Sequence, residues 1–151
     1  MNDKEIKRRI DRLKSLALAY VAMNEGELIE KYREKMRIFD ILSSSHSPHP
    51  HFLHRVYISR KALKHFVESR KAELLKKHTE DETIAIMHGA LEEIPCVILN
   101  FNVYRLEHDT HCYKKDYPGQ PSLQIGCDWS EGVLEIKTIH FVKIRKTKTP
   151  A

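Results

Sequence analysis

Apolar residues in the first forty positions follow two stripes with helical spacing. One stripe runs over Ile6–Tyr20 at intervals of three and four residues, and the second runs over Leu28–Phe39. Gly26 lies between them and predicts a break in the helix there. The pattern therefore predicts a helical hairpin over residues 1–42. Two short helices cannot bury both stripes against each other, so the hairpin either covers the rest of the chain or forms a homodimer through these helices.

The stretch over residues 43–54 reads SSSHSPHPHFLH. Its serines and prolines favour neither a helix nor a strand, so it is interpreted as a linker between the hairpin and the body of the protein. Its histidines are His46, His49, His51 and His54. Their spacing matches no zinc finger and no HExxH helix, which favours a tract with weak metal affinity over a specific metal site.

Strand and helix signals alternate between residue 55 and Pro95. Residues 56–58 are VYI, three good strand formers, and Ser59 is a residue type that caps helix N-termini. A helix is therefore expected to begin after Ser59. Thr79 and Glu82 have the spacing of a capping box, which predicts a second helix that ends near Pro95.

The period of the pattern changes to two after Pro95. Runs of β-branched and aromatic residues, separated by turn-forming residues, predict four strands: Cys96–Leu106, His111–Lys115, Leu123–Asp128 and Val133–Ile144. Four strands joined by short connections predict an antiparallel meander. With the two preceding helices they give a body of α+β class over residues 55–145, and residues 146–151 form a short basic tail.

Positive charge is concentrated in one segment of the chain. The whole chain has a net charge of +5, whereas residues 55–78 carry eight Lys or Arg against two Glu, a net charge of +6. This concentration predicts an anionic partner, with nucleic acid considered before an anionic membrane surface. No apolar run approaches membrane-spanning length, the N-terminal residues are too charged to begin a secretory signal, and the three cysteines have no CxxC spacing. These features favour the cytoplasm.

Charged side chains lie on defined faces of the predicted basic helix. Arg60, Lys64 and Lys71 share one face, where they form either a surface for a phosphate backbone or an ordinary solvated face. His65 lies on a small polar face opposite the apolar stripe. Arg70 falls inside the apolar stripe, where a charge is unfavourable unless it is paired or extends to water.

The last predicted strand carries two polar residues on an otherwise apolar face. Alternation places Thr138 and His140 on the same face as Leu134 and Ile136. A hydroxyl beside an imidazole suits proton transfer near neutral pH. The alternative, and the more common arrangement, is a buried threonine and histidine that form hydrogen bonds within the core. Sheet aromatics such as Tyr104 stack on bases if they face the basic helix, and otherwise pack at the rim.

Three segments of the chain occur in an order that resembles a superfamily of small nucleases. VYISRKALKHFVESRK is followed by a helix that ends in EEIP and by the terminal strand EIKTIHFVKI. This order is similar to the barnase, EndoU, colicin and RelE superfamily. Within it, the chain looks most like the phage-associated branch, in which a helix with a KH pair precedes an xxP segment and a terminal strand carries Thr or Ser. The resemblance covers roughly residues 55–145 and leaves the predicted hairpin unexplained.

The resemblance implies two helices packed on a four-stranded antiparallel sheet. It also implies a metal-independent endoribonuclease, of toxin or phage-associated type, that drives the ribose 2′-hydroxyl onto the adjacent phosphate. His65 and Thr138 match the motif positions, and His140 is added from its position on the strand as a proton-transfer residue. Candidate contacts to RNA are Arg60, Lys64, Arg70, Tyr104 and Lys114. The implied partners are RNA and an antitoxin or immunity protein, and no cofactor is implied.

Two other functions fit parts of the sequence. A non-catalytic basic module that binds nucleic acid or an acidic protein needs the basic helix but no proton-transfer groups. A metal-supported hydrolase needs the histidines of the linker. The sequence contains no Walker loop, GxSxG elbow or DxD pair, so nucleotide hydrolysis, serine hydrolysis and two-metal chemistry have no support. The nuclease hypothesis requires that His65, Arg70 and His140 border one cleft.

Overall fold

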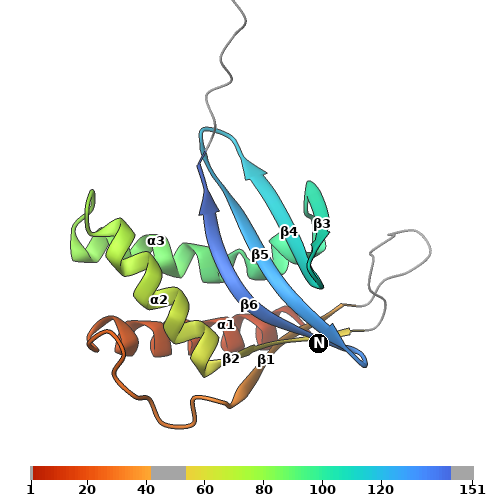
Figure 1. The fold of residues 1–151 in the computed structure, drawn as a ribbon, viewed down its shortest axis with the longest axis horizontal. Coiled ribbons are helices and arrows are strands. Elements are labelled where there is room, and N and C mark those ends of the chain that lie inside the picture. Colours follow the sequence, from red (N-terminus) through yellow and green to blue (C-terminus); the bar gives the residue numbers. More distant parts are fainter. Residues whose placement is uncertain (1, 42–53, 144–151) are drawn as a thin grey trace, which may run out of the picture.

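The computed structural model describes residues 2–41 and 54–143, which form one six-stranded sheet and four helices (Figure 1). The elements are α1 (Asp3–Val21), β1 (Lys35–Ile41), β2 (His54–Ser59), α2 (Arg60–Leu74), α3 (Glu80–Glu92), α4 (Ile94–Leu99), β3 (Val103–Glu107), β4 (Thr110–Tyr117), β5 (Gln120–Ser130) and β6 (Val133–Val142). The strand order is β1-β2-β6-β5-β4-β3, and only β2 and β6 are parallel neighbours. The α+β class is confirmed. The sheet is mixed and six-stranded, however, and the predicted four-stranded antiparallel sheet is therefore incomplete.

The second helix of the predicted hairpin does not form. After α1 the chain contains neither helix nor strand until β1 begins at Lys35. Met36 and Phe39 are buried in the core, whereas Leu28 of the expected helical stripe is 92% exposed. The segment is extended because its residues pair along β2, a distant partner that helical spacing does not reveal. The helical hairpin over residues 1–42 is therefore wrong.

Helix α1 packs against the rest of the same chain. Its buried residues are Ile10, Leu13, Ala17, Tyr20 and Val21. They belong to one hydrophobic core with residues of α2, α3 and the sheet, and α1 contacts α2, α3 and β1. In Figure 1, α2 lies to the left of the sheet, and α1 and α3 extend from the left as far as the strands. Of the two roles considered for the apolar stripe of α1, covering the body is the one observed.

Local capping signals set the starts of α2 and α3 where they were predicted. The Ser59 hydroxyl accepts a hydrogen bond from the backbone N–H of Ala62 at 3.0 Å, and α2 begins at the next residue after Ser59. Thr79 and Glu82 form a reciprocal capping box at the start of α3. Both predicted helix starts are confirmed.

Helix α4 occupies the beginning of the segment predicted as the strand Cys96–Leu106. Pro95 lies in the first turn of α4, where its fixed φ suits a helix and its missing N–H is not needed. Ile94, Val97 and Ile98 are buried at helical spacing, and the helix packs against β4 and β5. Only the later part of the predicted strand is extended, as β3.

The two segments predicted to flank the body fall almost entirely outside the described residues. The linker over residues 43–54 is described only at His54, the first residue of β2, so its other histidines and the tail over residues 146–151 lie outside. In the part of the chain that is described, no helix is both long and apolar enough to cross a membrane.

Candidate active site

A β-bulge at Lys137 changes the register of β6 in its middle. Cys127 of β5 pairs with Ile136, whereas its neighbour Gly126 pairs with Thr138. Lys137 is therefore an extra residue in β6 that has no paired residue in β5. Side chains beyond the bulge point to the face opposite to the one that strict alternation assigns them.

The bulge turns the two polar residues of β6 out of the core. Ile139 is buried, whereas Thr138 is half-buried and His140 is exposed. The predicted face shared with Leu134 is therefore wrong for both polar residues. They lie on the face of the sheet turned away from the core, which we call the open face, together with Gln124 directly opposite His140 in β5.

Helix α2 runs beside the edge of β6 beyond the bulge. This edge is accessible because β2 pairs with β6 only as far as Ile136, and α2 packs against β6. The two elements enclose a small cavity of about 10 Å³, which we call the α2–β6 hollow. Polar side chains lining it include His65, Ser69, Arg70, Thr138 and His140. Four of these five were predicted as site residues from the sequence, and the hollow brings them together.

The surroundings of His140 favour its neutral form. Partial removal of the ring from water lowers the pKa of His140 below 6.5, and the positive charges of Arg70 and His65 lower it further. Glu73 opposes this shift. An exposed imidazole that is neutral near pH 7 can accept a proton, so His140 is suited to act as a base.

Arg70 places a guanidinium group at the hollow. Its side chain is only 13% exposed, and its Nη1 lies 3.3 Å from a carboxylate oxygen of Glu73. Its Nε is buried and has no hydrogen-bond partner among the described residues. The sequence placed Arg70 inside the apolar stripe of the helix, and in the structure its charge is paired with Glu73. A guanidinium has five N–H donors, so those of its terminal nitrogens that Glu73 does not occupy are the ones suited to bind an oxyanion, such as a phosphate oxygen.

The other predicted RNA contacts lie away from the hollow. Arg60 is paired with Glu34 at 3.3 Å, and its side chain is 17% exposed. Tyr104 lies on the core face, where its hydroxyl is 2.6 Å from Nδ1 of His111. Lys114 does lie on the open face, because it pairs with Gln124, the partner of His140.

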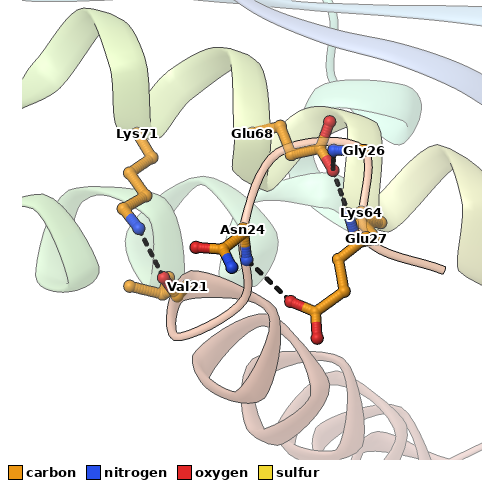
Figure 2. Close-up of polar contacts among 7 residues, drawn as sticks. All are labelled: Val21, Asn24, Gly26, Glu27, Lys64, Glu68 and Lys71. Atoms are coloured by element: carbon orange, nitrogen blue, oxygen red, sulfur yellow. Dashed lines mark hydrogen bonds and ion pairs between the residues drawn. The ribbon is translucent and has the colours of Figure 1, made fainter. Parts of the chain in front are cut away.

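Much of the basic charge of α2 is used to hold the connection between α1 and β1 (Figure 2). Lys64 is buried and forms an ion pair with Glu68. Glu68 also accepts a hydrogen bond from the backbone N–H of Gly26 at 3.4 Å, and Lys71 donates to the carbonyl of Val21 at 2.6 Å. The predicted face of Arg60, Lys64 and Lys71 is therefore engaged within the protein. The sequence reveals the spacing of these cations but not the distant groups that they bind.

We expect Glu68→Gln to destabilise the protein by about 1 kcal/mol at pH 7, because the variant loses the charge that pairs with buried Lys64. The Lys64 ammonium lowers the pKa of Glu68 below 4.5. A lowered folded-state pKa gives stability above pH 4.5 that is lost as the pH falls through that pKa. In urea unfolding, the difference from wild type should therefore shrink between pH 7 and pH 3. Exposed Glu25→Gln is the control, and a difference independent of pH would contradict the role of the ion pair.

Sequence reasoning missed three residues of this region. Gln124 faces His140 and Gly126 faces Thr138 only because of the β5–β6 register, which local patterns do not give. Ser69 lines the hollow from α2. The helical spacing already places it on the polar face of His65, four residues away, but does not single it out as a site residue.

Within residues 2–41 and 54–143, no three His, Cys, Asp or Glu side chains are grouped so that they could hold a metal ion. The hollow instead combines two imidazoles, a guanidinium and two hydroxyls. Such groups can transfer protons and bind an oxyanion. In comparisons with known proteins, no family model, no curated protein and no solved structure matches this chain.

Proposed function

We propose that the chain is a metal-independent endoribonuclease that cleaves RNA by attack of the ribose 2′-hydroxyl on the adjacent phosphate. The observation that carries this proposal is the meeting of His65, Arg70 and His140 at the α2–β6 hollow, with both imidazoles exposed to solvent. The reaction needs a base, an acid and a cation beside the phosphorus. The hollow holds one candidate for each.

The lowered pKa of His140 supports its assignment as the base. In this scheme His140 accepts the proton of the 2′-hydroxyl while the bond between O2′ and phosphorus forms. Arg70 binds a non-bridging oxygen and stabilises the charge that develops there. His65, as the imidazolium, donates a proton to O5′ while the bond between phosphorus and O5′ breaks. The products are a 2′,3′-cyclic phosphate and a 5′-hydroxyl, and the two histidines exchange protons with water before the next cycle.

The alternative of a non-catalytic basic module has less support from the contacts of α2. That function needs cations that are free to meet a polyanion. Three of those on α2 are instead engaged by Glu34, by Glu68 and by the carbonyl of Val21. Neither the exposed imidazole of His140 nor its neighbour Thr138 is required for such a module.

The proposal is tested by incubating the purified protein with a fluorescent single-stranded RNA in excess EDTA. We expect cleavage that is unaffected by EDTA and that leaves 2′,3′-cyclic phosphate ends, because the attacking group is the 2′-hydroxyl. A substrate with 2′-deoxyribose at every position should remain intact. The double variant His65→Ala/His140→Ala, purified in the same way, controls for contaminating nucleases. RNA that stays intact, or cleavage shared by the double variant, would overturn the proposal.

A further inference from the structure

A larger cleft lies next to the α2–β6 hollow. It has a volume of about 600 Å³ and opens between the end of α2, helix α3, the β4–β5 turn and the end of β6. Leu74, Ala90, Leu123 and Phe141 give it an apolar lining. Clefts of this size bind small organic molecules in other proteins. The apolar lining suits the flat face of a ring.

Gly89 forms part of the wall of this cleft in the last third of α3. A Cβ atom added to Gly89 would have no other atom within 4 Å, so packing inside the protein does not require glycine there. Glycine destabilises the interior of a helix by about 1 kcal/mol relative to alanine. The absence of a side chain leaves the cleft deep at this point, and it lets an occupant approach the backbone of α3.

The charges that face the cleft favour an anionic occupant. Two of its three carboxylates are paired with cations, Glu73 with Arg70 and Glu92 with Lys14, whereas Glu93 accepts a hydrogen bond from the neutral hydroxyl of Tyr117 and keeps its charge. The two lysines of the lining, Lys77 and Lys143, are exposed and have no ion-pair partner among the described residues. The charges without an ion-pair partner are therefore two lysines against Glu93, a net of 2 − 1 = +1, although the lining is largely apolar.

The hollow and the cleft are consecutive along the line where α2 meets β6. On α2, Arg70 lines the hollow and Glu73, one turn later, lines the cleft. On β6, His140 lines the hollow and its neighbour Phe141 lines the cleft, with their side chains on opposite faces of the sheet. A chain that passes over the edge of β6 facing α2 can therefore reach both sites.

We propose that the cleft binds the nucleotide next to the cleaved phosphate, and so sets which RNA sequences are cut. This proposal rests on the proposed ribonuclease function. The base lies on the apolar lining beside Phe141, close to Gly89. The phosphate that follows it lies near Lys77 and Lys143. Gln120 and Glu93, at the edge of the cleft, provide groups that can form hydrogen bonds to a base.

The test fills the cleft from Gly89 without changing the hollow. We expect Gly89→Ala to weaken binding slightly and Gly89→Leu to weaken it at least tenfold, as measured by calorimetric titration with each of the four nucleoside 5′-monophosphates. The same Leu variant should lower kcat/KM for RNA at least tenfold and flatten the preference among cleavage sites. Ala85→Leu introduces the same side chain at an exposed position of α3 outside the cleft and serves as the matched control. Thermal unfolding verifies that each variant is folded.

The outcomes distinguish the proposed nucleotide site in the cleft from the proposed ribonuclease activity. His140→Ala should lower cleavage by about 10²- to 10⁴-fold and still bind nucleotides, because His140 lies outside the cleft. RNA cleavage with nucleotide binding that is undetectable, or that Gly89→Leu leaves unchanged, would overturn the cleft as a nucleotide site and leave the nuclease intact. Nucleotide binding that depends on Gly89, in a protein that does not cleave RNA, would uphold the site and overturn the enzyme.

Discussion

Replacing His140 by alanine should lower the rate of RNA cleavage by about 10²- to 10⁴-fold, the range expected when a general base is removed. The protein should remain folded, because His140 is exposed on the open face. His65→Ala should have an effect of similar size, and the double variant should be little worse than either single variant, since both histidines act in one step. Cleavage of a fluorescent RNA under single-turnover conditions measures these rates.

His108→Asn is the matched control for these variants. His108 is exposed in the β3–β4 turn and has a positive φ of 46°, which asparagine tolerates. We expect this variant to cleave RNA at the wild-type rate. Equal losses in His108→Asn and His140→Ala would indicate a general effect on the protein, and cleavage unaltered by His140→Ala would remove His140 from the mechanism.

The pH dependence of cleavage provides a second measurement of the same role. His140 acts as a base only when neutral, and its pKa lies below 6.5 because of partial burial and the charges of Arg70 and His65. With falling pH, kcat/KM should therefore decline only below pH 6.5, as the imidazole becomes protonated. This limb of the profile should be absent from the residual activity of His140→Ala. A decline centred above pH 6.5 would contradict the assignment of His140 as the base.

Local signals in the sequence predicted the part of the fold that depends on neighbouring residues. The hydroxyls of Ser59 and Thr79 bind backbone groups three residues away, so the starts of α2 and α3 are visible in short stretches of sequence. The predicted strand Val133–Ile144 likewise corresponds to β6, over the residues that are described, although its alternation holds only as far as the bulge at Lys137. In each case the signal that predicts the element lies within a short stretch of sequence.

Features that depend on distant partners were not visible in the same way. Strand β1 is extended because it pairs with β2 across the segment over residues 42–53, and its apolar residues also fit a helical stripe. The start of α4 has no distinct signal, because a proline such as Pro95 predicts the end of one helix and equally suits the first turn of a new one. The bulge at Lys137 has no signature in β6 alone, since it exists only relative to β5.

The sequence therefore predicted residues that meet at the candidate site, but not the face of the sheet on which Thr138 and His140 lie. His65, Arg70, Thr138 and His140 meet as the nuclease hypothesis requires, but the bulge is what frees the last two from the core. Without an extra residue in β6, strict alternation would bury His140 beside Leu134. One inserted residue thus changes a core position into a candidate active-site position.

The strand β5 has no room for a side chain at Gly126. A Cβ atom at Gly126 would lie 2.5 Å from Oγ1 of Thr138 and 3.3 Å from Cγ2 of Thr110. Threonine is stiff at χ1, so Thr138 cannot turn aside freely. We expect Gly126→Ala to lower the free energy of unfolding by about 1–3 kcal/mol and to lower RNA cleavage, because the strand carrying Thr138 and His140 must shift.

A double-mutant cycle identifies the clash as the cause. In a Thr138→Ala background the offending oxygen is absent, and the nearest remaining atom of residue 138 is Cβ, 3.9 Å away. Gly126→Ala should then destabilise by much less, leaving a coupling energy of about 1–2 kcal/mol in urea unfolding. Gly89→Ala is the contrasting control, because open space and a helical backbone make alanine stabilising there by up to about 1 kcal/mol. Equal losses for Gly126→Ala in both backgrounds would show that the clash with Thr138 is not the reason for glycine at position 126. The fit between β5 and the candidate site would then not depend on this glycine.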